Sequence, residues 1–161
     1  NTQPEAFLYN FNDPERLRQI RRYLNRQKVK TRIVTAPEFL HPLGYLFEIP
    51  DFIPHPSLIW EAIFSDEMIV LKDFSSAQMD GFLAFFRENQ IPPVALKAML
   101  TPVTQHWSSI QLHDELSREH TLMHKKITAK PKSAESAAAF PADLFYLIFP
   151  TEKGDRSAQS P

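Results

Sequence analysis

The feature that most restricts the fold of this chain is an internal repeat. Two short apolar runs, 7–11 and 68–74, each end in phenylalanine and lead directly into residues that start helices. Runs of this kind are typical of buried strands. Asp13 and Pro14 suit the cap and first turn of a helix after the first run, and Ser75 and Gln78 have the spacing of a capping box after the second. We therefore expect a strand followed by a helix at both places.

The two expected helices repeat their apolar faces at one constant offset along the chain. The matched residues are Leu17, Ile20, Tyr23 and Leu24 in the first helix, and Met79, Phe82, Phe85 and Phe86 in the second. This spacing places one apolar stripe of each helix on a core. The same offset aligns Val29 with Ile91 and 32–34 with 94–96, which predicts a second strand in each copy.

A further helical element is expected in each copy, short around 42–47 and long over about 109–125, where Ser108 and Gln111 form another capping-box spacing. The order is then β-α-β-α twice, which predicts the α/β class. We expect a four-stranded, mainly parallel sheet in the order 2-1-3-4 with helices on both faces. A ferredoxin-like α+β sheet is the alternative topology.

The composition of the remaining segments suggests the domain organisation. We expect a single α/β domain over 1–126, with 1–65 as the first copy plus a connecting segment and 66–126 as the second copy. Within the connection, 58–64 reads as a short buried helix. Residues 127–161 read as a linker and tail, in which the apolar segment 144–149 must dock on this chain or on a partner.

Several functional classes lack their chemical devices in this sequence. There is no cysteine, so disulfides and cysteine-ligated metals are excluded, and a cytoplasmic location is expected. No apolar run is long enough for a membrane span. None of the three glycines follows an expected strand, which excludes a recognisable dinucleotide or phosphate-binding loop. We expect no cofactor.

The charges are unevenly distributed, although the net charge is only −1. The segment 14–32 forms a basic helix whose polar face carries a patch of four arginines, Arg18, Arg21, Arg22 and Arg26, whereas 48–80 is strongly acidic. These oppositely charged faces would allow a homo-oligomer. Nucleic-acid binding through the basic helix is an alternative that we do not favour, because no aromatic residues alternate with the arginines.

Three histidines share one stripe of the last expected helix, at His113, His120 and His124. Histidines one helical turn apart can bind a metal or serve an enzyme. Zinc needs three or four ligands, however, and no second segment offers one that completes the set. We therefore predict no metal site, and we expect these side chains to lie beside the core face of the helix.

A ligand site is also expected where the first strands of the two copies end. If these strands are parallel neighbours, Asn10, Asn12 and Asp13 lie beside Asp73, Ser75 and Ser76. Open α/β sheets bind ligands at such a switch point. The same residue types are also ordinary helix caps.

The segment 91–107, with Lys97-Ala-Met-Leu-Thr101-Pro followed by Trp107 and then by Glu119-His120, resembles a family of small bacterial domains of unknown function. The resemblance covers about residues 68–121, the second copy only. It implies a fold unit and a bacterial, cytoplasmic setting, and it implies no activity. It also directs attention to Lys97, Thr101 and Trp107 as the lining of a small polar pocket, against the simpler reading in which Trp107 is part of the core.

Taken together, these patterns favour a non-catalytic binding or regulatory module. The alternative is an enzyme of unrecognised type that uses Lys97 or the histidine stripe. The ligand-binding candidates are Lys97, Thr101, Trp107, Asn10, Asp73 and Ser75.

Overall fold

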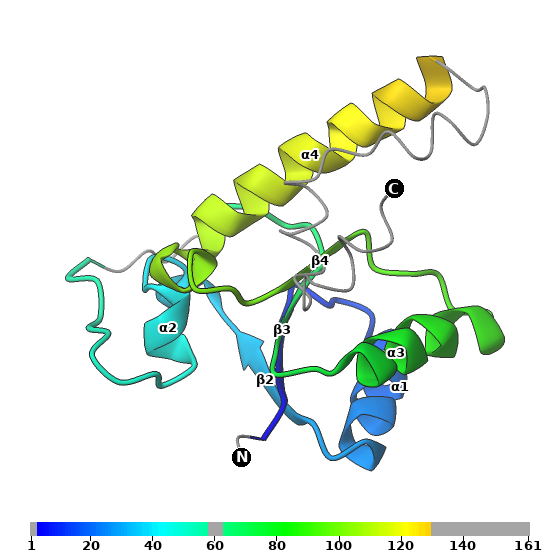
Figure 1. The fold of residues 1–161 in the computed structure, drawn as a ribbon, viewed down its shortest axis with the longest axis horizontal. Coiled ribbons are helices and arrows are strands. Elements are labelled where there is room, and N and C mark those ends of the chain that lie inside the picture. Colours follow the sequence, from blue (N-terminus) through cyan, green and yellow to red (C-terminus); the bar gives the residue numbers. More distant parts are fainter. Residues whose placement is uncertain (1–2, 58–62, 130–161) are drawn as a thin grey trace, which may run out of the picture.

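The repeat is present in three dimensions. A computed structural model describes residues 3–57 and 63–129, without the side chains of 124–129. Along the chain it contains β1 (Glu5–Tyr9), α1 (Pro14–Arg26), β2 (Lys30–Val34), η1 (Ala36–Glu38), α2 (Leu43–Leu46), β3 (Met68–Lys72), α3 (Ser76–Glu88), β4 (Leu96–Met99), η2 (Thr104–His106) and α4 (Ser109–Ala129) (Figure 1). The predicted order β-α-β-α, twice, is confirmed. The expected docking segment 144–149 and most of the expected helix 58–64 lie outside the described residues.

The four strands form one sheet in the order β2-β1-β3-β4, as predicted. The pairs β1–β2 and β3–β4 are parallel, so each copy contributes one parallel βαβ unit. The central pair β1–β3 is antiparallel, with Glu5 opposite Lys72 and Tyr9 opposite Met68. The sheet is therefore mixed but mostly parallel, and the α/β class is confirmed.

The direction of β3 is reversed relative to β1 and β2. The connection between the copies runs over 35–67 and contains η1 and the one-turn helix α2. The chain then enters β3 beside the end of β1, with Met68 opposite Tyr9, so β3 runs back along β1.

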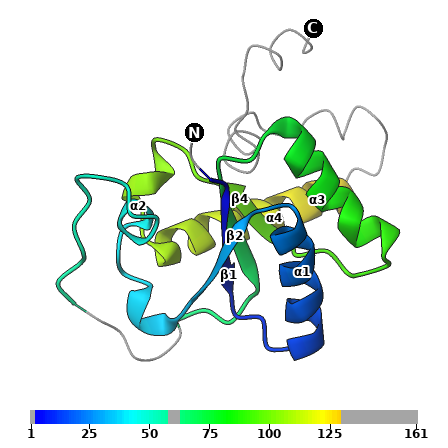
Figure 2. The same ribbon diagram turned by 90° about the horizontal axis from the view of Figure 1, so that it is seen from below.

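The two units are related by an approximate two-fold axis that passes through the sheet between β1 and β3. Helices α1 and α3 cover one face, while α2 and the first part of α4 cover the other (Figure 2). The backbone repeats with them: Asn10 and Asp73, which follow the first strands, both have left-handed φ angles of 60° and 63°. Lys28 and Gln90, which follow the helices, have φ angles of 63° and 56°.

Each face of the sheet has its own hydrophobic core. The α1/α3 core is built mainly on Ala6, Leu8, Ile20, Leu24, Ile69, Leu71, Met79, Phe82, Phe85 and Phe86. The α2/α4 core is built mainly on Phe7, Tyr9, Val34, Phe39, Leu43, Phe47, Met68, Val70, Leu112 and Leu116. Both cores take residues from both units, so neither unit has a complete core of its own.

The predicted helix starts are confirmed at the level of single hydrogen bonds. The carboxylate of Asp13 accepts the backbone N–H of Glu15 at 3.0 Å. The side chains of Ser75 and Gln78 bond each other's backbone N–H groups at 3.0 and 2.8 Å. Ser108 and Gln111 do the same at the start of α4, at 3.1 and 2.9 Å.

The alignment of the second strands is wrong, however. Thr31 lies opposite Ala6 in the first unit, and Lys97 lies opposite Ile69 in the second. The equivalent of 30–34 is therefore 96–100 rather than 92–96. The reason is that the connection 89–95, which contains Pro92 and Pro93, is longer than 27–29. The constant offset holds through the helices and is lost in this loop.

None of the helices in the described ranges is long and apolar enough to cross a membrane.

Candidate functional site: the arginine face of α1

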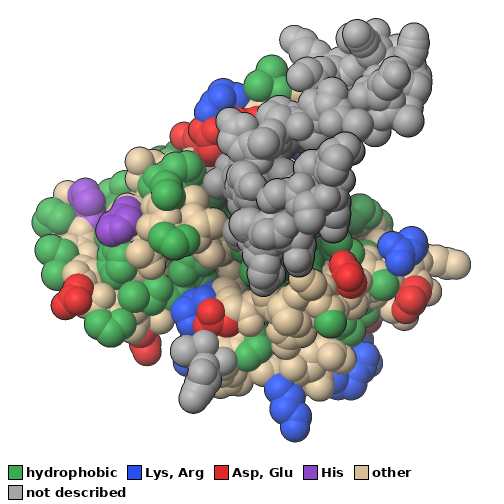
Figure 3. Space-filling model, viewed as in Figure 1, with side chains coloured by type: hydrophobic (Ala, Val, Ile, Leu, Met, Phe, Trp, Pro, Cys, Tyr) green, Lys and Arg blue, Asp and Glu red, His purple; other side chains and the backbone are tan. Residues whose placement is uncertain are grey.

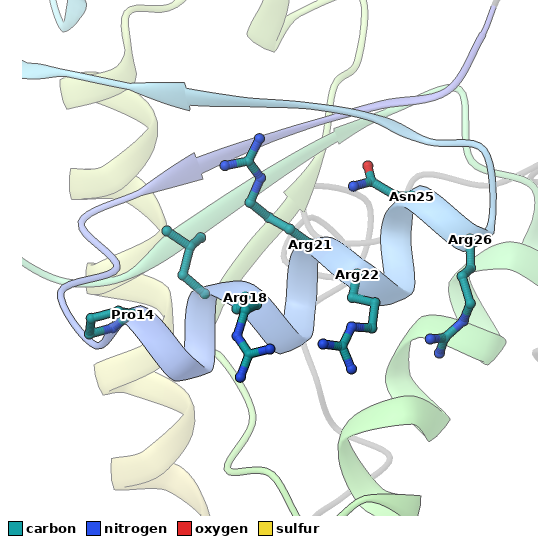
Figure 4. A pocket seen from close by; sticks show the side chains of 7 residues that line it. Pro14, Arg18, Arg21, Arg22, Asn25 and Arg26 are labelled. Carbon is teal, nitrogen blue, oxygen red and sulfur yellow. The ribbon is translucent and has the colours of Figure 1, made fainter.

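A concave surface lies along α1. It is a groove of about 590 Å³ lined by Pro14, Leu17, Arg18, Arg21, Arg22, Asn25 and Arg26. All four predicted patch arginines therefore line one groove. In Figure 4, Arg18, Arg22 and Arg26 extend from the side of α1 turned away from the strands, whereas Arg21 extends toward them. We call this surface the arginine groove.

The arginines of the groove differ in how far they are neutralised. Arg18 forms an ion pair with Glu15 on the same helix, and Arg21 donates to the hydroxyl of Thr31 at 3.3 Å. Arg22 and Arg26 are exposed, and neither forms an ion pair with the residues that the structure describes. In the view of Figure 3, Lys and Arg side chains are scattered over the surface, and several of them stand along the lower edge of the molecule. The groove thus carries charge that the described part of the fold leaves uncompensated.

The twin helix α3 shows that this charge is not a requirement of the fold. Both helices have 13 residues and pack on the same face of the sheet. The α3 residues at the positions of Arg18, Arg22 and Arg26 are Asp80, Ala84 and Glu88. The apolar stripe is kept in both helices while the outer face changes from basic to mildly acidic. The arginine groove is therefore a property of the first unit alone.

The acidic stretch 48–80 does not form one opposing face. Glu67 is bound by Arg16, whose guanidinium lies 2.8 Å from the carboxylate, and Asp73 pairs with Lys72 at 2.8 Å. The carboxylate of Asp66 lies 2.8 Å from Nε2 of His113. Among the residues that the structure describes, the basic helix meets this stretch at one residue, Arg16, which also donates to the carbonyl of Pro92 at 2.6 Å.

The predicted switch-point site is not formed. Because β1 and β3 are antiparallel, Asn10 and Asp73 follow the strands at opposite ends of this central pair. They lie about 20 Å apart, at about 3.4 Å per strand residue. Asn10 donates to the carbonyls of Phe64 and Asp66 at 3.2 and 3.0 Å and so fixes the entry to β3. Ser75 caps α3. Asn12 and Asp13 precede α1 and Ser76 begins α3, and these two helix starts likewise lie at opposite ends of the antiparallel strands.

Nor does the structure bring Lys97 and Trp107 together. Leu96 and Ala98 belong to the α2/α4 core and Met99 packs on the α1/α3 core, so strand alternation places Lys97 on the α1/α3 face. Its ammonium donates to the carbonyl of Val94, and burial lowers its pKa. Trp107 packs against the opposite core. Thr101 exchanges hydrogen bonds with the buried Thr104, each backbone N–H donating to the other hydroxyl at 2.9 Å, which shapes the turn before α4.

The two described histidines of the stripe, His113 and His120, lie in different surroundings. His113 is buried: its Nε2 lies 2.8 Å from Asp66 and its Nδ1 lies 3.2 Å from Asp114, while the ring stacks on Phe64 with centroids 4.0 Å apart. His120 is exposed, and the side chain of His124 lies outside the described residues. Over 3–57 and 63–123, no three His, Asp or Glu side chains are placed to hold a metal ion together. His113 thus joins α4 to the segment that enters β3.

One further pocket was not predicted from the sequence. It has a volume of about 460 Å³ and lies around α2, where its charged and aromatic lining includes Arg32, Glu38, His41, Tyr45, Glu48 and Asp51. Most of these residues belong to the segment that does not repeat between the two units. The lack of a counterpart in the second unit could have drawn attention to this segment. The spacing of its residues along the chain could not show that their side chains meet.

Comparison with known proteins gives a match for the second unit alone. Residues 67–123 match the family model described as a domain of unknown function (DUF3783). The match runs from the entry of β3 into α4 and agrees with the resemblance seen over 68–121, which is thereby confirmed. No curated protein and no solved structure matches the chain. The arginine groove lies outside the matched unit.

Proposed function

We propose that this protein is a non-catalytic interaction module that binds an acidic segment of a partner protein along the arginine groove. The observation that supports the proposal most directly is the groove itself. It combines the arginine row of α1 with the apolar side chains of Pro14 and Leu17. Arg22 and Arg26 project from it without a carboxylate partner among the described residues.

The spacing of the arginines suits a helical or extended acidic segment. Arg18, Arg22 and Arg26 follow one another at one turn of α1, which separates their stems by about 6 Å. Carboxylates one turn apart on a partner helix have the same spacing. Guanidinium groups pair with carboxylates in a planar, two-point geometry, so each pair adds orientation as well as attraction. The apolar floor would receive a leucine or similar residue between the acidic positions.

A protein partner is favoured over nucleic acid by the composition of the groove. Bases bind to single-strand sites largely by stacking on aromatic side chains, and the described lining of the groove contains none.

Binding without catalysis is favoured by the chemistry of the same residues. The described lining consists of proline, leucine, asparagine and arginine. None of these side chains exchanges a proton near neutral pH, and arginine stays protonated. The groove therefore offers positive charge and shape, but no nucleophile and no general base.

The proposal is tested by titrating the protein with a fluorescent peptide that carries glutamates one helical turn apart and leucines beside them. We expect saturable binding that weakens as salt rises, because the exposed charges are screened. Replacing Arg22 with Glu should weaken binding at least tenfold, since it exchanges an attraction for a repulsion.

The matched control is Arg87→Glu, which makes the same charge change on the exposed surface of α3, outside the groove. It should leave the affinity nearly unchanged. Equal weakening by the two variants would show a non-specific charge effect and would contradict the proposal. A single-stranded oligonucleotide that binds the wild type more tightly than the peptide does, and that loses its affinity in the Arg22→Glu variant, would also contradict the proposal. The surface would then be a nucleic-acid site.

The proposal carries two further predictions about the setting of this module. We expect the functional domain to comprise residues 1–126, with 127–161 as a linker and tail. We also expect a cytoplasmic location, for which the cysteine-free sequence is suitable.

A further inference from the structure

The pocket around α2 is separate from the arginine groove and differs from it in charge. It has a volume of about 460 Å³, within the usual range for small-molecule sites. Its walls come from β2, η1, α2 and the loop 48–52, so the side chains that meet there belong to several elements. None of its described lining residues also lines the arginine groove.

Arg32, the one Lys or Arg in the described lining, is already neutralised. Its guanidinium pairs with Glu38, donates to the carbonyl of Leu46 at 2.9 Å and lies 5.6 Å from the ring centre of Phe7. Glu38 is also used, because its other oxygen accepts the backbone N–H of Thr35 at 3.0 Å. The carboxylates of Glu48 and Asp51 are exposed and pair with none of the described residues. The pocket therefore has two uncompensated negative charges.

The loop that carries these carboxylates is held firmly against α2. Glu48 and Asp51 both have left-handed φ angles, 61° and 77°. The ring of Phe52 lies so close to Gly44 that a Cβ there would be 2.6 Å from it. The same ring lies 5.0 Å from that of His106, centre to centre. The loop can lie this close to α2 because residue 44 is a glycine, which has no Cβ.

Aromatic surface completes the pocket. Tyr45 is 36% exposed, and its ring meets that of His41 edge-on with centres 5.0 Å apart. The Nδ1 atom of His41 accepts the backbone N–H of His55 at 3.0 Å, which fixes the orientation of this ring beside Tyr45. Tyrosine rings attract cations placed over their faces.

We infer that this pocket is a binding site for an organic cation, an alkylammonium or a guanidinium group. Glu48 and Asp51 would bind the charged head, and the aromatic rings of Tyr45 and Phe52 would contact the alkyl part. The volume exceeds that of a single metal ion, and the described residues hold no cluster of three metal-ligating side chains. Two carboxylates beside aromatic rings are the chemistry that recognises amines and guanidinium groups.

The test uses butylguanidinium as the probe and butylurea, its neutral counterpart of the same shape, as the comparison ligand. Amide chemical-shift changes should concentrate in 41–52 and saturate with butylguanidinium, whereas butylurea should give none. The double variant Glu48→Gln/Asp51→Asn should bind the probe at least tenfold more weakly. Asparagine tolerates the left-handed backbone of Asp51, so the fold of the loop is kept.

The control variant Asp80→Asn/Glu88→Gln removes the same charges from the exposed side of α3 and should bind the probe as the wild type does. Equal binding of butylurea, or full affinity in the Glu48→Gln/Asp51→Asn variant, would overturn the inference. A short peptide with one arginine between glycines and serines identifies the source of the cation. Binding as tight as that of butylguanidinium supports a side chain of a partner protein, and binding of the free cation alone supports a small molecule.

Discussion

At the scale of single residues, one buried polar pair joins the two units. The hydroxyl of Tyr9 on β1 lies 2.7 Å from that of Ser109, the first residue of α4, and both residues are 0% exposed. Burial raises the pKa of the Tyr9 phenol well above its usual value, which keeps it protonated and able to donate. The pair therefore gives each hydroxyl group a hydrogen-bond partner, although both groups are buried from water.

Replacing Tyr9 with Phe should destabilise the protein by about 1–3 kcal/mol, because the Ser109 hydroxyl stays buried without its partner. The double variant Tyr9→Phe/Ser109→Ala should recover part of that loss, as measured by urea denaturation. Tyr45→Phe, at an exposed position, is the control and should have little effect. Strict additivity of the Tyr9→Phe and Ser109→Ala losses would show that the pair contributes nothing.

Lys97 makes stability depend on pH in a defined direction. Burial lowers its pKa in the folded state from the ordinary value of 10.5. Between the folded and unfolded pKa values the unfolded chain binds more protons, so the unfolding free energy contributed by this residue rises with pH. Relative to Lys97→Met, the wild type should gain stability as the pH is raised toward 10.5. A difference between the two proteins that stays constant from neutral pH to 10.5 would be inconsistent with a buried amine.

The local features of the residues could be read from the sequence, whereas their long-range partners could not. The caps at Asp13, Ser75 and Ser108 depend on neighbours three residues away, so spacing was sufficient to predict them. The pairing of Tyr9 with Ser109 depends on how distant elements pack. The pocket around Glu48 and Asp51 depends on the conformation of a loop that has no counterpart in the second unit.

At the scale of elements, α1 and α3 meet through a small residue. Tyr23 of α1 stacks on Phe85 of α3 with ring centres 4.6 Å apart, and its hydroxyl would lie 3.0 Å from a Cβ at Gly81. The lack of a side chain at Gly81 allows this close contact between the twin helices. The apolar stripes of both helices predicted that they face a core, but not that they face each other, because helical periodicity does not identify the partner.

Gly81→Ala should therefore have opposing effects. Alanine favours a helix by about 1 kcal/mol over glycine, but its methyl group presses against the Tyr23 hydroxyl. We expect a small net change in thermal stability in the wild type and a clear gain in the Tyr23→Phe background, where the contact is relieved. If alanine stabilises both backgrounds equally, the tight contact has no energetic consequence.

At the scale of the whole molecule, the two units share one sheet and both hydrophobic cores. The matched segment 67–123 contains β3, a central strand whose other neighbour is β1. Without the first unit, one edge of β3 and half of both cores would be exposed. The sequence predicted the strand order correctly, but the direction of the second unit depended on the connection between the units, which carries no periodic signal.

The isolated fragment 67–123 should consequently show no cooperative unfolding as a monomer in circular dichroism. Adding fragment 3–66 should restore cooperative folding, since it supplies β1 and the missing core residues. A second copy of 67–123 could take the same place across the two-fold axis, which would give concentration-dependent folding. Cooperative unfolding of a monomeric fragment, independent of concentration, would contradict this account.

The same two-fold relation supplies the most direct test of the proposed function, because α3 shows which outer residues the shared fold tolerates. Arg18→Asp, Arg22→Ala and Arg26→Glu together give α1 the residues found at the equivalent positions of α3. The measurement is the affinity of this triple variant for the acidic peptide, with thermal stability as the check on folding. We predict that binding falls below detection while the protein remains folded. Unchanged affinity in the folded triple variant would contradict the assignment of the arginine groove as the binding surface.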